Sequence, residues 1–208
     1  KNLILFEAIT NQYNPNYEKV RELLPKVGDV KIVQLNYSQY SSRYDAFKQG
    51  IVAPVFDAEK AGGALMDLNV YNIHFVTGLF GEPKAVHYYP NMERGVDTSG
   101  ILVMEYPSFQ CVCIAAKDCG APLSVNIEGD KGCIFSHSNA GRFEEFSFQE
   151  NKKESEHFSL IQEDGPIFYD ELRAFTDYWV KDDREAFRQR LAQSLVVMKV
   201  LDQARGIV

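Results

Sequence analysis

Three residues of one predicted helix carry the side chains best suited to chemistry: Asp67, Tyr71 and His74. Residues at i, i+4 and i+7 lie on one face of a helix, so this spacing places all three within a sector of roughly 60°. A carboxylate accepts hydrogen bonds from hydroxyl groups, and a phenol or an imidazole can transfer a proton. The stripe therefore indicates either a pocket for a hydroxylated substrate or a structural network in which the three side chains satisfy one another.

In a substrate pocket each residue of the stripe has a plausible task. Asp67 would accept hydrogen bonds from vicinal hydroxyls, and Tyr71 would pass a proton to or from an alcohol oxygen. His74 would orient either group or act as the proton donor itself. Because the ordinary pKa of a tyrosine is about 10, Tyr71 needs a nearby Lys or Arg before it can act as a base at neutral pH.

The helix that carries the stripe is predicted to run from about residue 64 to residue 79, after Gly62-Gly63 and with Gly78 and Gly81 at its end. Its apolar residues point in nearly every other direction, so we expect the helix to be buried. Burying an acid, a phenol and an imidazole together costs several kcal/mol unless they are paired or line a wet cleft. The apolar residues are Leu65, Met66, Leu68, Ile73, Phe75, Val76, Leu79 and Phe80.

The remaining elements are predicted from apolar periodicity and turn residues. We expect strands at 2–8 and 29–40, a helix opened by Asn14-Pro15 and ended by Pro25 and Gly28, a polar loop at 41–60, and helices at 168–181 and 184–205. Short strands of an antiparallel meander fill 83–161. This pattern predicts an α+β fold in which a large, mostly antiparallel sheet has its helices packed on one face. The expected breaks in the meander are Pro90-Asn91, Gly95, Pro107-Ser108, Gly120, Gly129-Asp130 and Asn139-Ala140-Gly141.

Composition excludes several classes of protein. The 208 residues suffice for one well-cored domain, and the formal charge of −7 argues against a nucleic-acid-binding surface. No stretch reaches the ~20 apolar residues of a membrane span, so we expect a cytoplasmic protein. Cys111 and Cys113 fit alternate positions on one face of a strand, and we expect all four cysteines to be reduced. No metal-ligand spacing occurs.

Other candidate residues carry weaker signals. Arg43 and Tyr44 lie in the polar loop, from which they would reach substrate or remain solvated. His87, His137 and His157 are expected on the surface of the sheet. The sequence lacks Gly-x-Gly-x-x-Gly and other phosphate-binding signatures, so nothing in it would hold a nucleotide unaided.

Residues 62–74, GGALMDLNVYNIH, resemble the substrate-domain helix of the glucose–fructose oxidoreductase, inositol dehydrogenase and MocA family. The resemblance covers nearly the whole chain. It also includes Glu7-Ala8 followed by Asn14-Pro15, Gly28-Asp29-Val30, Gly81-Glu82-Pro83 and the helix at Ser194-Leu195-Val196-Val197.

The resemblance implies a Rossmann domain upstream of Lys1 and NAD or NADP as cofactor. It places Asp67 where the family has a substrate-contacting acid and Tyr71 where many members have a catalytic His. In having Tyr at this position, the sequence resembles the glucose–fructose oxidoreductase and dihydrodiol dehydrogenase branches, which also carry Tyr there. Because the usual His is absent, His74 is the second choice of proton donor. Glu7 would be a weak cofactor contact, and the family's Glu-Lys-Pro lysine would lie upstream.

From the resemblance we expect residues 1–10 to be the last Rossmann strand, 11–165 the substrate and oligomerisation domain, and 166–208 helices that pack back on the Rossmann domain. The full protein would be an oxidoreductase that moves hydride between nicotinamide and a hydroxyl carbon of a sugar, polyol or dihydrodiol-like substrate. It would form a homodimer or homotetramer through its sheet, and this chain alone would be inactive. The alternative is a non-catalytic sugar-binding or assembly module with the same fold.

Overall fold

A computed structural model describes residues 4–161, 166 and 168–207. Its centre is an eight-stranded sheet with the order β2-β3-β4-β1-β5-β6-β7-β8. Neighbouring strands run antiparallel except β1 and β4, which are parallel. The strands are β1 Val30–Ser38, β2 Ala85–Glu93, β3 Val96–Glu105, β4 Gln110–Ala116, β5 Ser124–Gly129, β6 Gly132–Ser136, β7 Phe146–Glu150 and β8 Glu156–Phe158.

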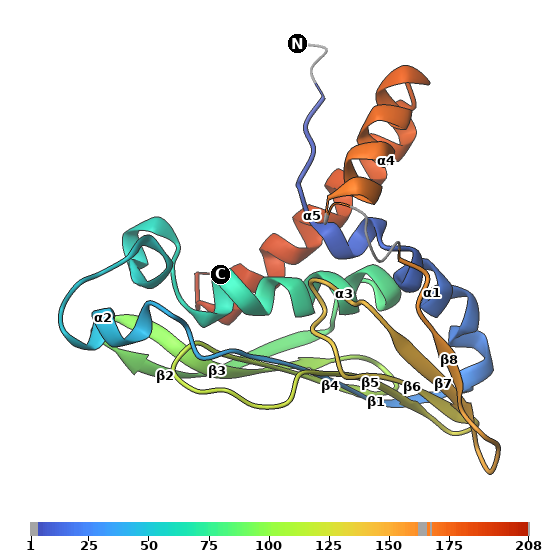
Figure 1. The fold of residues 1–208 in the computed structure, drawn as a ribbon, viewed down its shortest axis with the longest axis horizontal. Coiled ribbons are helices and arrows are strands. Elements are labelled where there is room, and N and C mark those ends of the chain that lie inside the picture. The colour runs from blue at the N-terminus through green and yellow to red at the C-terminus, as the bar shows by residue number, and fades with distance from the viewer. Residues whose placement is uncertain (1–3, 162–165, 167, 208) are drawn as a thin grey trace.

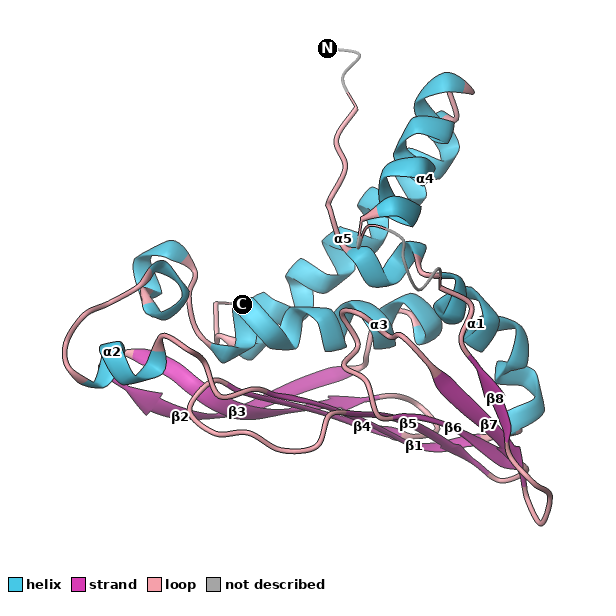
Figure 2. Cartoon of the chain, in the orientation of Figure 1, coloured by secondary structure: helices cyan, strands magenta, loops and turns pink. Residues whose placement is uncertain are grey.

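The helices gather on one side of this sheet, so the predicted α+β architecture is confirmed (Figures 1 and 2). The end of α4 and the N-terminal segment project together away from the sheet. The helices are α1 Pro15–Val27, α2 Tyr44–Lys48, α3 Val70–Phe80, α4 Tyr169–Val180 and α5 Arg184–Ala204, and a π-helical turn at Leu65–Asn69 leads into α3. Short 3-10 turns lie at Thr10–Tyr13, Pro54–Phe56 and Ala58–Lys60.

The core lies between the helices and the covered face of the sheet. Val33 and Leu35 of β1 and Cys111 and Cys113 of β4 all face it and are fully buried. All four cysteines are free, and Cys111 and Cys113 share one buried face of a strand as predicted, whereas Cys119 is exposed. The other face of the sheet alternates to polar and exposed apolar side chains, such as Ile101.

The strand predicted at residues 2–8 does not belong to the eight-stranded sheet, and its assignment to a Rossmann sheet stays a prediction. Residues 2 and 3 lie outside the described part of the chain, and Ile4–Ala8 joins no sheet within it. A strand is stabilised by its ladder partners, and none of the eight strands offers its backbone to this segment. Instead Phe6 stacks on Phe175 of α4 at a ring-centroid distance of 4.1 Å.

Three predicted breaks turn out to lie inside elements. Pro25 sits in the last turn of α1, where its missing N–H costs only one helical bond. Pro90 lies within β2, an edge strand, where a residue without a donor is tolerated. Gly78 lies inside α3, and glycine occurs there because a Cβ would meet the hydroxyl oxygen of Tyr17 at 2.2 Å.

The loop predicted at 41–60 is more ordered than expected. It contains α2 and two 3-10 turns around a small cluster of its own, in which Phe47 and Phe56 stack at 4.7 Å with Val96 and Tyr44 against them. We call residues 44–60 the lobe. Aromatic side chains made this ordering possible, since their burial offsets the entropy lost by the backbone.

Candidate active site

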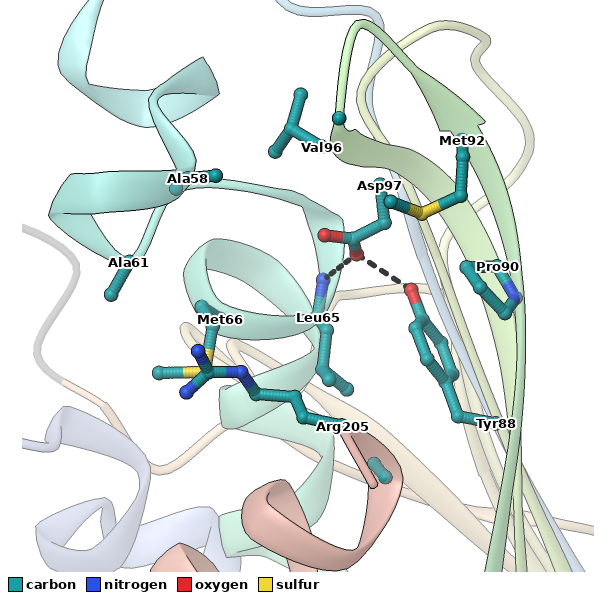
Figure 3. Close-up of a pocket in the computed structure, with 13 residues that line it drawn as sticks. Ala58, Ala61, Leu65, Met66, Tyr88, Pro90, Met92, Val96, Asp97 and Arg205 are labelled. Carbon is teal, nitrogen blue, oxygen red and sulfur yellow. Dashed lines mark hydrogen bonds between the residues drawn. The ribbon is translucent and has the colours of Figure 1, made fainter. Parts of the chain in front are cut away.

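The helix of the stripe begins at a tightly packed anchor. One carboxylate oxygen of Asp97 accepts hydrogen bonds from the Leu65 backbone N–H at 2.7 Å and the Tyr88 hydroxyl at 2.6 Å (Figure 3). Gly63, at φ +114°, lies so close that a Cβ would fall 2.0 Å from the other carboxylate oxygen. Burial raises the pKa of Asp97, and the hydrogen bonds from Tyr88 and Leu65 oppose that rise. Only glycine at position 63 allows this approach.

A largely apolar pocket lies beside this anchor (Figure 3). Neither Asp67 nor Tyr71 lines it, so it is separate from the stripe. Its lining residues are Ala58, Ala61, Gly62, Leu65, Met66, Tyr88, Pro90, Met92, Gly95, Val96, Asp97, Ala204 and Arg205.

Asp67 forms an ion pair that sequence reasoning missed. Its Oδ2 lies 2.5 Å from Nζ of Lys117, which also donates to the Val55 carbonyl at 2.7 Å. The Asp67 side chain is 39% exposed, whereas that of Lys117 is 3% exposed. No hydrogen bond engages Oδ1 of Asp67 within the described ranges. The carboxylate therefore keeps a free acceptor on an accessible side chain.

Tyr71 is half-buried, and its ring lies 6.1 Å from that of Tyr37 on β1. Backbone of the 137–145 loop packs on the ring, since a Cβ at Gly141 would lie 3.2 Å from Cδ1 of Tyr71. Asn11 fixes the helix at this point by donating from Nδ2 to the Tyr71 carbonyl at 2.9 Å. In the described part of the chain the Tyr71 hydroxyl has no hydrogen-bond partner.

The surroundings of Tyr71 favour its protonated form. Burial raises the pKa of its hydroxyl, and the negative charges of Asp67 and Glu171 raise it further. The pKa of Tyr37 is raised by burial in the same way. Tyr71 is therefore a neutral hydroxyl at physiological pH, able to donate a proton or a hydrogen bond.

His74 lies apart from these two residues. It is fully buried, and its Nε2 lies 3.2 Å from Oε1 of Glu7. Its Nδ1 has no partner within the described ranges. The hydrogen bond from His74 lowers the pKa of Glu7 against the opposing effect of burial. The structure thus places Asp67 and Tyr71 at accessible positions, whereas His74 closes a contact between α3 and the N-terminal segment.

Asn69 and Asn72 decide which face of the helix meets the sheet. Both are fully buried. Asn69 donates to the Cys113 carbonyl at 3.2 Å and Asn72 to the Ile114 carbonyl at 3.1 Å, both on β4. A further bond of 2.9 Å links the two amides. These side chains are the polar anchors of the helix on the sheet.

The two loop candidates do not join the stripe. Arg43 is exposed, and its guanidinium donates only to the hydroxyl of Ser42, at 3.4 Å, within the described residues. The Tyr44 hydroxyl donates to Glu93 at 2.8 Å, and this bond is the main cause that raises the pKa of Tyr44 to about 12. Tyr44 is the first residue of the lobe, and Arg43 directly precedes it. Among the described residues, no group of three or more His, Cys, Asp or Glu is arranged to hold a metal ion.

Lys117 left a signal in the sequence. Cys111, Cys113 and Ala115 alternate on the buried face of β4, and the same period of two continues to Lys117. A lysine on a buried face requires a partner. Tyr37 and Asn11 left no such signal, because only the folded chain brings them to the helix.

Comparison with known proteins identifies the relatives. A model of the GFO/IDH/MocA C-terminal domain matches residues 17–135. The chain is 30% identical over 212 residues to a scyllo-inositol 2-dehydrogenase (NADP(+)) of Bacillus subtilis, covering 99% of this chain and 63% of that protein. It is 33% identical over 139 residues to a trans-1,2-dihydrobenzene-1,2-diol dehydrogenase of Xenopus tropicalis, covering 64% of this chain and 40% of that protein.

Solved structures share the fold at low sequence identity. A 3-ketoreductase from Actinomadura kijaniata, in complex with NADP and TDP-benzene, superposes with a TM-score of 0.77 at 18% identity over 98% of this chain and 62% of its own. An aldose-aldose oxidoreductase from Caulobacter crescentus, complexed with glycerol, superposes with a TM-score of 0.74 at 15% identity, over 99% of this chain and 63% of its own. The chain spans about three fifths of these structures. The family model, matching more than half of the residues, shows that this chain belongs to the GFO/IDH/MocA family, whose C-terminal domain it contains.

Proposed function

We propose that this chain forms the substrate side of an NAD- or NADP-dependent oxidoreductase acting on a hydroxyl carbon of a sugar, polyol or dihydrodiol-like molecule. The proposal rests on one observation: the same helix carries a protonated Tyr71 hydroxyl without a hydrogen-bond partner in the described structure and an accessible Asp67 carboxylate. Relatives named as inositol and dihydrodiol dehydrogenases support this substrate class, since all of these molecules offer neighbouring hydroxyls.

Each of the two residues has a distinct role in this proposal. Tyr71 exchanges a proton with the reacting oxygen, and Asp67 accepts a hydrogen bond from a neighbouring hydroxyl and so orients the substrate. His74 is not proposed as the donor, because its ring is buried against Glu7. Glu7 contacts His74 through Oε1 and keeps 36% of its side chain exposed, so it stays the weak candidate for a cofactor contact.

The nicotinamide cofactor would supply or accept the hydride. The residues described here fit the substrate side of that reaction, since Tyr71 and Asp67 have free polar atoms and the sequence offers no phosphate-binding loop. We therefore propose that the dinucleotide is held mainly by a Rossmann domain upstream of Lys1, which also supplies the cation that Tyr71 needs to act as a base.

The position of such a domain is indicated by apolar side chains that this chain leaves uncovered. On α4, Leu172, Trp179 and Val180 are exposed, and Trp179 retains 66% of its surface. The neighbouring N-terminal segment exposes Leu5 and stacks Phe6 on α4. We propose that this projecting corner, formed by residues 4–10 and α4, packs against the cofactor domain (Figure 1).

We further propose that the open face of the sheet joins a second copy of the chain. This face exposes Ile32 on β1, Tyr89 on β2 and Ile101 on β3, and helices cover only the opposite face (Figure 1). Ile101→Lys should shift the protein toward monomers in analytical ultracentrifugation. The free thiols, typical of a reducing compartment, support a cytoplasmic location.

The decisive experiment follows nicotinamide oxidation or reduction by the full-length polypeptide with a panel of inositols, aldoses and dihydrodiols. We expect turnover that Asp67→Asn lowers at least tenfold, because the charged acceptor of the substrate hydroxyl becomes a neutral amide. Lys153→Gln, an exposed residue of the β7–β8 hairpin, is the matched control. Polyol binding without turnover would instead support a non-catalytic binding module.

A further inference from the structure

Lys117 is a buried charge that no assigned role explains. It directly follows β4, and its backbone is fixed on both sides, since its N–H donates to the Thr98 carbonyl at 2.8 Å and its own carbonyl accepts from the Ser41 N–H at 2.9 Å. Its side chain reaches Asp67 and the Val55 carbonyl, and Nζ lies 4.7 Å from the centre of the Phe56 ring. Three separate segments therefore meet at one ammonium group.

Burying an ammonium group is costly unless its charge and donors are compensated. A carboxylate, a backbone carbonyl and an aromatic face provide that compensation here. Because only 3% of the side chain is exposed, Lys117 has almost no surface with which to touch a substrate. Asp67, with 39% of its side chain exposed, does have that surface. Any effect of Lys117 on a ligand must therefore pass through Asp67.

The two oxygens of Asp67 are in different situations. Oδ2 is held by Lys117, whereas Oδ1 has no hydrogen bond within the described part of the chain. A carboxylate held at one oxygen has lost most of its rotational freedom, so the other oxygen offers its lone pairs in a fixed direction. The lobe contributes to this fixation, because Val55 and Phe56 hold the ammonium in place.

We propose that Lys117 is a positioning residue that aims Oδ1 of Asp67 at one particular hydroxyl of the substrate, with the lobe as its support. This inference rests on the proposed function of Asp67 as the acceptor of a substrate hydroxyl. It predicts that the protein discriminates sharply between a polyol and the analogue lacking that hydroxyl. It also predicts that this discrimination depends on Lys117.

The test measures affinity by calorimetry in the full-length protein, so that it does not depend on turnover. The probes are inositols and aldohexoses together with their monodeoxy analogues. For the wild type we expect removal of one hydroxyl to weaken binding tenfold or more, since a charged acceptor loses its donor. In Lys117→Met this ratio should fall to about two, and Lys117→Arg, which keeps the charge, should retain part of it. Lys153→Met, which breaks an exposed ion pair, is the control and should keep the wild-type ratio.

The outcomes separate the two proposals. A wild-type protein that binds each polyol and its deoxy analogues equally would overturn both the role of Asp67 and that of Lys117. A wild-type preference that persists at full size in Lys117→Met would overturn the inference alone. If Lys117→Met does not fold, Lys117→Arg decides the question. The longer arginine side chain alters the contact with Asp67, so an unchanged ratio of polyol to deoxy-analogue affinity would contradict positioning by this lysine. A purely structural role would lower stability without changing the ratio.

Discussion

The two ends of the Asp67–His74 stripe each make one polar side-chain contact, and they differ in which partner of that contact is buried. At one end the residue on the helix, Asp67, is accessible and its partner Lys117 is buried. At the other end the helix residue, His74, is fully buried and its partner Glu7 is 36% exposed. Two polar residues seven positions apart on one helix therefore have opposite environments.

This difference separates a site that can bind a ligand from a contact that joins elements. A buried partner leaves the accessible carboxylate free to meet a substrate. A buried imidazole held by a carboxylate of another segment has no such access. Its hydrogen bond instead stabilises the position of the N-terminal segment on α3. The comparison teaches that helical spacing identifies a candidate stripe, whereas access to solvent decides which of its members do chemistry.

Tyr71→Phe tests the accessible end and should produce the largest effect. We expect turnover to fall by 10² or more in the full-length enzyme, because the proton-transferring hydroxyl is removed. The free energy of unfolding should change by less than about 0.5 kcal/mol, since that hydroxyl has no partner in the described structure. Steady-state kinetics and urea denaturation measure the two quantities. Unimpaired turnover would remove Tyr71 from the proposed mechanism.

Asn72→Ala tests the anchoring of the same helix on the sheet. The substitution removes the Asn72 donor from the Ile114 carbonyl and from the buried amide oxygen of Asn69, so stability should fall by about 1–3 kcal/mol. Urea denaturation of this chain measures the change. Asn91→Ala, at an exposed residue bonded to Ser99, is a control with a smaller expected loss. Equal losses in both variants would contradict the anchoring role.

Glu7→Gln tests the buried end through its pH dependence. The pKa of Glu7 is lowered in the folded protein, so the charged form stabilises the fold above the ordinary value of 4.5, and this contribution disappears as pH falls through the lowered pKa. Because Glu7 is more than a third exposed, we expect a contribution of under about 1 kcal/mol. Denaturation at neutral and at acidic pH should show that the glutamine variant lacks this extra loss. An identical pH profile would indicate that the contact contributes nothing to stability.

Arg43→Ala should have the smallest effect and marks the boundary of the site. Its side chain is exposed and bonds only weakly to Ser42 within the described structure, so both turnover and stability should stay close to wild type. A marked rise in KM would show that the surface next to the lobe contacts substrate and that the site extends beyond Asp67 and Tyr71.

Much of the fold could be predicted because its signals are local. The alternation of β4, the turn at Gly129-Asp130 and the periodicity of α4 and α5 each follow from the nearest residues. The errors have non-local causes. Pro90, predicted as a break, lies within a strand because that strand is at an edge. The strand predicted at residues 2–8 stays a prediction, since its expected ladder partners belong to the proposed Rossmann domain and not to the eight strands.

The sequence by itself determined the family resemblance, the α+β class and the membership of Asp67 and Tyr71 in one helical stripe, since all of these depend on residue types and short spacings. Only the tertiary structure decided that His74 turns toward Glu7, that Asn69 and Asn72 face the sheet, and that Lys117 reaches Asp67 across 50 positions of the chain. These contacts join distant segments. Their geometry comes from the packing of the helix on the sheet, which no local pattern encodes.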